Sequence, residues 1–154
     1  MEEPIQSLID EQYLGKNETS RIWRPCNIYP TANIGKDVNI GMFSEIGEHV
    51  TIGDRARIGA GSFIPEGVTI EEDAWIGPHV IFANDKFPLS PKEAWLPTLV
   101  KTGAKIGAGC CILPGVTIGV NSLLGMGSTL TKDLPDGEVW AGNPARKLEQ
   151  KEAK

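Results

Sequence analysis

An aliphatic or aromatic residue recurs every six positions along most of this 154-residue chain. The first run starts at Ile28 and ends at Phe82, and the second starts at Val100 and ends at Leu130. Small or β-branched residues follow four positions after most members of both runs. A fixed short period over about two thirds of a chain indicates stacked, near-identical units.

The six-residue period fits neither a helix nor a plain strand, because helices bury residues near a period of 3.6 and half-buried strands near 2. The unit Val38-Asn39-Ile40 alternates apolar, polar and apolar residues, as in a short strand with two side chains facing inward. Gly41 then begins a corner, where flexible backbone is needed. We therefore expect each unit to be one strand and one corner, and stacked coils to pair these strands in parallel.

Segments such as IGEHVT and IGPHVI share an aliphatic residue, a glycine, two variable residues and a small residue. This pattern resembles the hexapeptide-repeat family over about residues 28–134. The resemblance implies an all-β fold, a left-handed parallel β-helix of triangular cross-section. Sixteen repeat positions, at three per coil, imply about five coils. The handedness follows from the resemblance alone, because general rules favour right-handed crossovers.

We expect three parts in the chain: a lead-in segment at residues 1–27, the β-helix at 28–134 and a C-terminal tail at 135–154. Apolar residues near one face predict a short helix over residues 4–14. The end of the tail, rich in Lys and Glu, predicts a short C-terminal helix that caps the open column. Residues 83–99 interrupt the repeat and predict one protruding loop.

Composition limits the partners and the compartment. The net charge of −5 argues against nucleic acid and anionic membrane surfaces. No apolar run approaches about 18 residues, and the acidic start MEEP lacks a signal-peptide core, so we expect a cytoplasmic protein. Cys26, Cys110 and Cys111 form neither a disulfide framework nor a zinc-type spacing, and no metal is expected.

The loop at 83–99 is the strongest candidate for a functional segment, since loops of this length are usually functional. The alternative is a solvated excursion that only blunts sheet edges. The segments GPHVIFANDKFPLSP and TLVKTGAKIGAG resemble hexapeptide enzymes that acetylate the amine of nucleotide-linked amino sugars with acetyl-CoA. Ala83 and Leu89 stand where that subgroup has Thr and Arg, which leaves the sugar undetermined.

The resemblance assigns roles to loop residues. It implies that the Asn84 amide orients the substrate and that Asp85 accepts a hydrogen bond, and then the proton, from the amine. Lys86, Glu93 and Trp95 are the candidate substrate-binding residues. The plain alternatives stay open, because Asn-Asp is ordinary turn chemistry and Trp95 is equally suited to anchoring the loop.

The C-terminal third resembles the cofactor-binding half of the same family, in TLVKTGAKIGAGCC and LLGMGSTLTKDLPDGEVWAGNPARKL. It implies that the pantetheine arm of acetyl-CoA, the acyl donor, runs close to the backbone of glycine-rich corners. The implied cofactor-binding residues are Lys101, Gly107, Ala108, Gly125, Gly127, Lys132, Asn143, Arg146 and Lys147. A charged, solvated tail is the alternative for the basic residues.

The two histidines bear on the type of acyl transfer. An amine is nucleophilic once neutral, whereas a sugar hydroxyl needs a base, usually His. His49 lies in an ordinary corner, and His79, one corner before the loop, is the candidate base or substrate contact. Two histidines are too few for the three-His zinc site of hexapeptide carbonic anhydrases.

We therefore expect an acetyl-CoA-dependent N-acetyltransferase in which the amine of a nucleotide-linked amino sugar attacks the thioester directly. The alternatives are a sugar or serine O-acetyltransferase that uses His79, and a non-catalytic β-helix scaffold. Outward apolar residues mark interfaces. Phe63, Trp75, Ile81 and Leu123 therefore predict a homotrimer with three active sites in the clefts between prisms.

Overall fold

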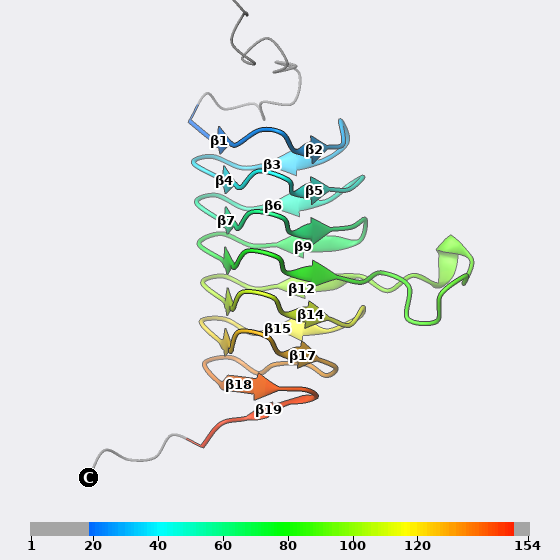
Figure 1. Ribbon diagram of the computed structural model, residues 1–154, viewed down its shortest axis with the longest axis vertical. Coiled ribbons are helices and arrows are strands. Elements are labelled where there is room, and N and C mark those ends of the chain that lie inside the picture. The colour runs from blue at the N-terminus through cyan, green and yellow to red at the C-terminus, as the bar shows by residue number, and fades with distance from the viewer. Residues whose placement is uncertain (1–18, 150–154) are drawn as a thin grey trace, which may run out of the picture.

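The computed structural model describes residues 19–149, which form one parallel β-helix with three sides (Figure 1). The first face contains the strands β1 (Arg21–Ile22), β4 (Asn39–Ile40), β7 (Arg57–Ile58), β10 (Trp75–Ile76), β13 (Lys105–Ile106), β16 (Leu123–Leu124), β18 (Val139–Gly142) and β19 (Ala145–Lys147). The second face contains β2 (Asn27–Ile28), β5 (Glu45–Ile46), β8 (Phe63–Ile64), β11 (Ile81–Phe82), β14 (Cys111–Ile112) and β17 (Thr129–Leu130). The third face contains β3 (Asn33–Ile34), β6 (Thr51–Ile52), β9 (Val68–Ile70), β12 (Thr98–Val100) and β15 (Thr117–Ile118).

Three series of corners connect these faces. The first corner joins the first face to the second, the second corner joins the second face to the third, and the third corner leads back to the first face. Strands pair in parallel with the strand one coil away, so Trp75 pairs with Arg57 on one side and with Lys105 on the other. The 83–97 segment between these coils therefore adds residues without changing the register.

The core is the predicted aliphatic column. Val38 and Ile40 are buried and Asn39 between them is half-buried, which confirms the predicted alternation, although the strand β4 contains only Asn39 and Ile40. Ile40, Ile76, Ile106 and Leu124 are fully buried, whereas Ile22 and Trp140 at the two ends of the same face are partly buried, so each inner coil seals its neighbours. Burying such a side chain stabilises the fold by roughly 1.5–3 kcal/mol, which accumulates along the stack.

The close approach of successive coils explains the glycine after many strands. A Cβ atom on Gly59 would lie 2.2 Å from the backbone nitrogen of Pro78 in the next coil. A Cβ atom on Gly107 would lie 2.4 Å from the backbone nitrogen of Met126. Any side chain at these positions would force the coils apart.

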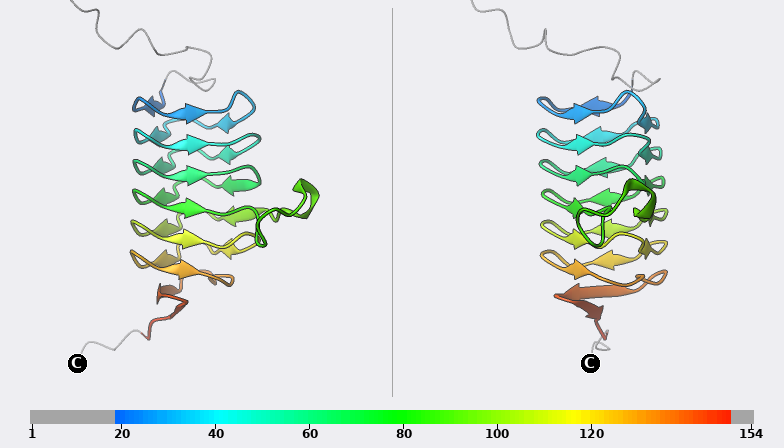
Figure 2. Two further views of the ribbon diagram at one scale, coloured as in Figure 1. Left: turned by 45° about the vertical axis from the view of Figure 1, so that its right-hand side comes forward. Right: turned by 90° about the vertical axis from the view of Figure 1, so that its right-hand side faces the viewer.

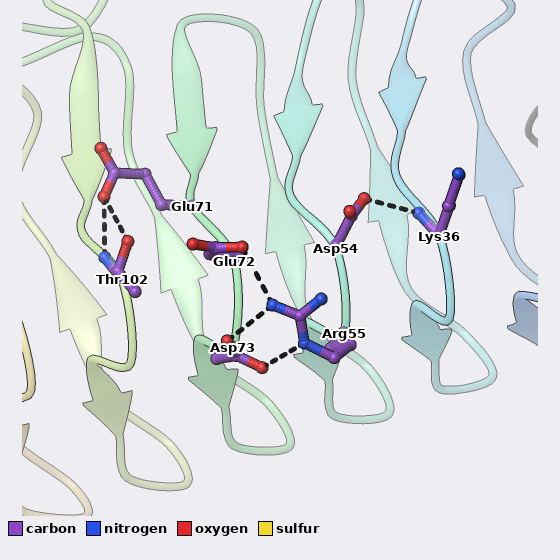
Figure 3. Close-up of polar contacts among 7 residues, drawn as sticks. All are labelled: Lys36, Asp54, Arg55, Glu71, Glu72, Asp73 and Thr102. Atoms are coloured by element: carbon purple, nitrogen blue, oxygen red, sulfur yellow. Dashed lines mark hydrogen bonds and ion pairs between the residues drawn. The ribbon is translucent and has the colours of Figure 1, made fainter.

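Side-chain contacts between coils reinforce the third corner (Figure 3). Arg55 donates hydrogen bonds to Asp73 at 2.7 and 2.9 Å and to Glu72 at 2.9 Å, in the next coil. The bond from Arg55 lowers the pKa of Asp73 below its ordinary value. Glu71 accepts hydrogen bonds from the backbone and the hydroxyl of Thr102 in the same manner. These contacts join successive coils at the third corner and pair the Arg55 guanidinium with two carboxylates of the next coil.

The prediction of about five coils is too low. The third face gives five complete coils, and β16, β17 and the bridge between Ile118 and Leu134 form a sixth, after which β18 begins another turn. The extra turns come from β1, which lies inside the predicted lead-in segment, and from the tail. The short helix predicted over residues 4–14 lies outside the described residues.

The short helix predicted for the Lys- and Glu-rich end of the tail lies largely outside the described residues, and residues 135–149 contain no helix. Residues 139–147 form an antiparallel hairpin, in which Trp140 pairs with Lys147 and Gly142 with Ala145. Val139 and Trp140 extend the first face next to β16, and Pro144 in the turn cannot continue a helix. Residues 150–154 lie outside the described range. Between residues 19 and 149, the structure has no helix of the length and apolar character needed to cross a membrane.

The loop leaves the second corner after β11 and returns at β12, as Figure 2 shows from two sides. It spans residues 83–97, so the return is two residues earlier than predicted. The loop contains one short 3-10 helix, η3 (Lys92–Ala94). It is the one large departure from the prism among the described residues and therefore the first place to look for a site.

Candidate active site

Hydrogen bonds to Asp85 and between backbone groups hold the 83–97 loop together where it leaves the prism. The Asp85 carboxylate accepts hydrogen bonds from the backbone nitrogens of Phe87 at 3.1 Å and Ser90 at 3.0 Å. The backbone nitrogen of Leu96 donates to the Asn84 carbonyl at 3.2 Å. Asp85 therefore acts in loop folding, as its turn chemistry allows, and its catalytic role stays a prediction.

Lys92 folds the tip of the loop back onto the second corner. Its ammonium lies 2.7 Å from a Glu66 carboxylate oxygen and 3.7 Å from a Glu48 oxygen. It also lies 6.0 Å from the centre of the Trp95 ring. The hydrogen bond to Glu66 raises the pKa of Lys92 above its ordinary value. Each pair is partly exposed and individually weak, at about 0–1 kcal/mol.

A groove of about 340 Å³ lies between the folded-back loop and the second face. The loop contributes Asn84, Lys92 and Trp95 to its lining. The second face and corner contribute Tyr29, Glu45, Glu48, Phe63 and Glu66. Three carboxylates against one lysine give this groove negative charge, which favours a cationic group such as a protonated amine.

Glu48 and Glu66 also lie near His49, and one ligand atom from each of the three falls within 4.8 Å of the others. Both carboxylates already face the Lys92 ammonium, which offsets part of their negative charge. His49 itself is exposed in the second corner, as predicted for a corner residue.

The structure brings together only part of the predicted substrate set. Asn84 and Trp95 are half-buried and line the groove. Lys86 is exposed and lies 5.8 Å from the centre of the Phe87 ring, and Glu93 is exposed on η3. Neither is part of the groove lining. Their roles as substrate contacts remain predictions.

Sequence reasoning missed Lys92, Glu48 and Glu66. No local pattern singles out these residues, because Lys92 meets its partners only after the loop folds back across two coils. The weak signal available was positional: Glu48 and Glu66 are 18 residues apart and occupy the second corner of successive coils that precede the loop.

His79 lies in the first corner, at the opposite end of β11 from Asn84. Its side chain is exposed and its backbone is left-handed, with a φ of +55°. Asn84 and His79 therefore flank the same face on different edges of the prism. A single chain does not bring the predicted catalytic residues into one site.

An open edge of backbone runs below His79 along the first corner. Gly109 donates a backbone hydrogen bond to the Pro78 carbonyl at 2.9 Å, and Gly127 donates to the Ala108 carbonyl at 2.8 Å. Both glycines have left-handed backbone, with φ of +70° and +68°, and a Cβ atom on either would meet no atom within 4 Å. The edge is therefore uncovered over two successive coils.

The predicted glycine-rich set lies along this edge. Gly107 and Ala108 lie in the first corner of one coil, and Gly125 and Gly127 lie in the same corner of the next coil. Gly142 then donates a hydrogen bond to the Ser128 hydroxyl at 3.0 Å, which places the hairpin turn that carries Asn143 at the end of the edge. Cys110 is buried behind it and Cys111 is exposed, as predicted.

The predicted basic residues are distributed over the prism. Lys101 lies in the third corner and Lys132 in the second, while Arg146 and Lys147 lie on β19. Lys147 forms an ion pair with Glu138 at 2.6 Å, and Arg146 donates to the carbonyl of Ala145 at 2.8 Å. These cations do not form a single phosphate site within one chain.

Two protein-family models match parts of this chain. The family model described as bacterial transferase hexapeptide (six repeats) matches residues 31–66. The model described as hexapeptide repeat of succinyl-transferase matches residues 103–132. The two matches lie on either side of the loop and coincide with regular coils.

Curated relatives include both N- and O-acetyltransferases. The galactoside O-acetyltransferase of Lactococcus lactis is 37% identical over 86 residues, which covers 48% of this chain and 42% of the relative. The dTDP-3-amino-3,6-dideoxy-alpha-D-galactopyranose 3-N-acetyltransferase of Aneurinibacillus thermoaerophilus is 46% identical over 54 residues, covering 35% and 28%. The chain spans less than half the length of the curated relatives it matches.

Among solved structures, AntD, an N-acyltransferase from Bacillus cereus in complex with dTDP and 3-hydroxybutyryl-CoA, is similar over almost the whole fold. The TM-score is 0.82 at 25% sequence identity, and the match covers 96% of this chain and 88% of AntD. Taken with the six-residue period and the three-sided parallel β-helix, these matches show that the chain contains hexapeptide repeats over residues 31–66 and 103–132, in a fold similar to that of AntD.

Proposed function

We propose that the protein is an acetyl-CoA-dependent N-acetyltransferase that acts on the amine of a nucleotide-linked amino sugar. The observation that carries this proposal is the open edge of the first corner, where Gly109 and Gly127 leave the backbone of two coils uncovered. AntD, similar over almost its whole length, was solved with an acyl-CoA and a nucleotide. An extended thioester arm is the substrate group that fits a narrow strip of exposed backbone.

The donor side of the site follows from this edge. The pantetheine arm lies along the corners of Gly107 and Gly125 and passes Gly109 and Gly127, where a Cβ atom would meet no atom within 4 Å and the backbone is open. The hairpin turn with Asn143 closes the lower end. The phosphates of CoA then meet basic side chains, for which Arg146 and Lys147 on β19 are the candidates nearest in the fold.

The acceptor side is the groove under the loop. Its carboxylates attract the ammonium form of the amino sugar, and the Asn84 amide contributes a hydrogen-bond donor and acceptor within the same lining. Asn84 orients the amine and the acetyl carbonyl for reaction, a positioning effect that enzymes exploit strongly. Trp95 supplies an apolar wall.

The proposed step is direct. The neutral amine attacks the thioester carbonyl, a C–N bond forms, and the C–S bond breaks as the tetrahedral intermediate collapses. The proton leaves the nitrogen for a base, with Asp85 or His79 as candidates, and the departing thiolate takes up a proton to give free CoA.

We further propose that the active protein is a homotrimer with three composite sites. The donor edge and the acceptor groove lie on different edges of one prism, so the first corner of one protomer has to meet the loop of the next. Outward apolar residues are exposed on both faces: Trp75 and Leu123 on the first, Phe63 and Ile81 on the second. Static light scattering at micromolar concentration tests this, and a monomer would contradict it.

A sugar O-acetyltransferase is the second candidate, favoured by the galactoside O-acetyltransferase relative and by the exposed His79 imidazole. A hydroxyl nucleophile requires a base, so this activity would depend on His79 by the full factor of about 10² to 10⁴ that general-base catalysis supplies.

One assay separates the candidates. The protein is incubated with acetyl-CoA and a dTDP- or GDP-linked amino sugar, or with the analogue that has a hydroxyl in place of the amine. Free thiol release and the mass of the sugar product are then measured. We expect acetylation of the amine and not of the hydroxyl analogue. Acetylation of the hydroxyl alone would support the second candidate, and no turnover on either would support the scaffold.

A further inference from the structure

We propose that Gly61 is a positioning residue for His79: it leaves the space in which the imidazole packs against the preceding coil. This rests on the proposed function only for its catalytic consequence. The contact itself is a property of the fold and is tested separately from activity.

The geometry at the first corner carries this inference. A Cβ atom on Gly61 would lie 2.6 Å from Nδ1 and 2.7 Å from Cε1 of His79. Real Cβ contacts are never that short, so the Nδ1–Cε1 edge of the ring occupies the space that a side chain at position 61 would need. The backbone nitrogen of His79 also donates to the Ala60 carbonyl at 2.8 Å, which fixes the base of the side chain next to this glycine.

The same corner position in successive coils is occupied by Phe43, Gly61, His79, Gly109 and Gly127, all with left-handed backbone. His79 is therefore the last side chain before the open edge, and its ring leans away from that edge, toward Gly61. This orientation keeps the edge clear for the thioester arm and holds the imidazole at its upper end. A methyl group at position 61 would remove the space and push the ring out of this orientation.

The chain offers a matched control for the backbone. Gly61 has a φ of +69° and Gly137 also has a φ of +69°, so an alanine at either position bears the same left-handed strain. A Cβ atom on Gly137 would meet no atom within 4 Å, and Gly137 lies in the third corner, away from the proposed site. The difference between Gly61→Ala and Gly137→Ala therefore isolates the contact with His79.

The first test needs no activity. The chain contains two histidines, so their imidazole signals in heteronuclear NMR spectra are easily assigned with a His79→Ala variant. We expect Gly61→Ala to shift the His79 ring signals and leave those of His49 in place, while Gly137→Ala shifts neither. Gly61→Ala should also lower the thermal stability more than Gly137→Ala does. This difference should vanish when both changes are made in a His79→Ala protein, because an alanine side chain at position 79 leaves room for the Cβ atom at position 61. Unchanged His79 signals, or an extra loss that persists without the imidazole, would overturn the proposal.

The second test concerns the reaction. We expect Gly61→Ala to lower kcat for acetyl transfer by the same factor as His79→Ala, within about twofold, once the Gly137→Ala effect is removed. The double variant should be no slower than His79→Ala alone, because both changes remove one correctly placed imidazole. Multiplicative losses in the double variant would show that Gly61 does not act through His79. If the wild type shows no acetyl transfer, the proposed function fails while the NMR and stability outcomes still decide the contact.

Discussion

Phe82→Ala should destabilise this protein more than almost any other single truncation. Phe82 is fully buried at the repeat position just before the loop. In all the other coils, the equivalent position on the second face carries Ile or Leu. Its Cα partner in the next coil is Ile112, which is also buried. Removing a buried Phe ring costs about 3–5 kcal/mol, because transfer energy is lost and a cavity stays behind.

Urea unfolding followed by circular dichroism measures this effect. With a slope of about 2 kcal/mol per molar urea, the midpoint should fall by about 1.5–2.5 M. Phe87→Ala is the control, since Phe87 lies in the loop with 73% of its surface exposed and should change stability by no more than about 0.5 kcal/mol. Protein concentration is held constant, because an assembly makes the midpoint concentration-dependent. Equal midpoints for the two variants would refute the sealed-column account of the core.

Three further results are expected at the candidate site. Asn84→Ala should lower kcat strongly while calorimetry shows unchanged CoA affinity, because Asn84 is assigned to orienting the reacting groups; full activity would remove it from the site. His79→Ala should slow transfer to an amine by less than about 100-fold, with the rate rising with pH as the substrate amine deprotonates; near-total loss with normal folding would favour the hydroxyl-directed reaction. Lys92→Met should raise KM for the acceptor up to about fivefold, an effect that fades in high salt, because exposed ion pairs contribute at most about 1 kcal/mol; Lys86→Met is the control, and equal effects of the two would show that docking of the loop tip is irrelevant.

The sequence predicted the prism well because a six-residue period fixes which side chains face inward. The stacking of outward residues 18 positions apart follows from the same period: Phe63 pairs with Ile81, and Arg57 pairs with Trp75. The number of coils was not, because β1 and β18 continue the stack with units that break the pattern. Handedness cannot be derived from a period at all.

The site was predictable only in part. The resemblance proposed Asn84, and the position one corner before the loop proposed His79. The structure places these residues at opposite ends of β11, and their catalytic roles stay predictions. The Lys92 contacts with Glu66 and Glu48 could not be anticipated, since they depend on how the loop folds back. The C-terminal hairpin was not predicted, because the expectation for the tail rested only on the Lys- and Glu-rich composition of its end, beyond the hairpin.

The most direct test of the central claim is acetyl transfer by the purified protein, followed by thiol release from acetyl-CoA in the presence of a nucleotide-linked amino sugar. The account predicts that one free CoA forms for each N-acetylated sugar. It predicts no thiol release above background when a hydroxyl replaces the amine. Turnover of the hydroxyl analogue with no reaction at the amine would contradict the account.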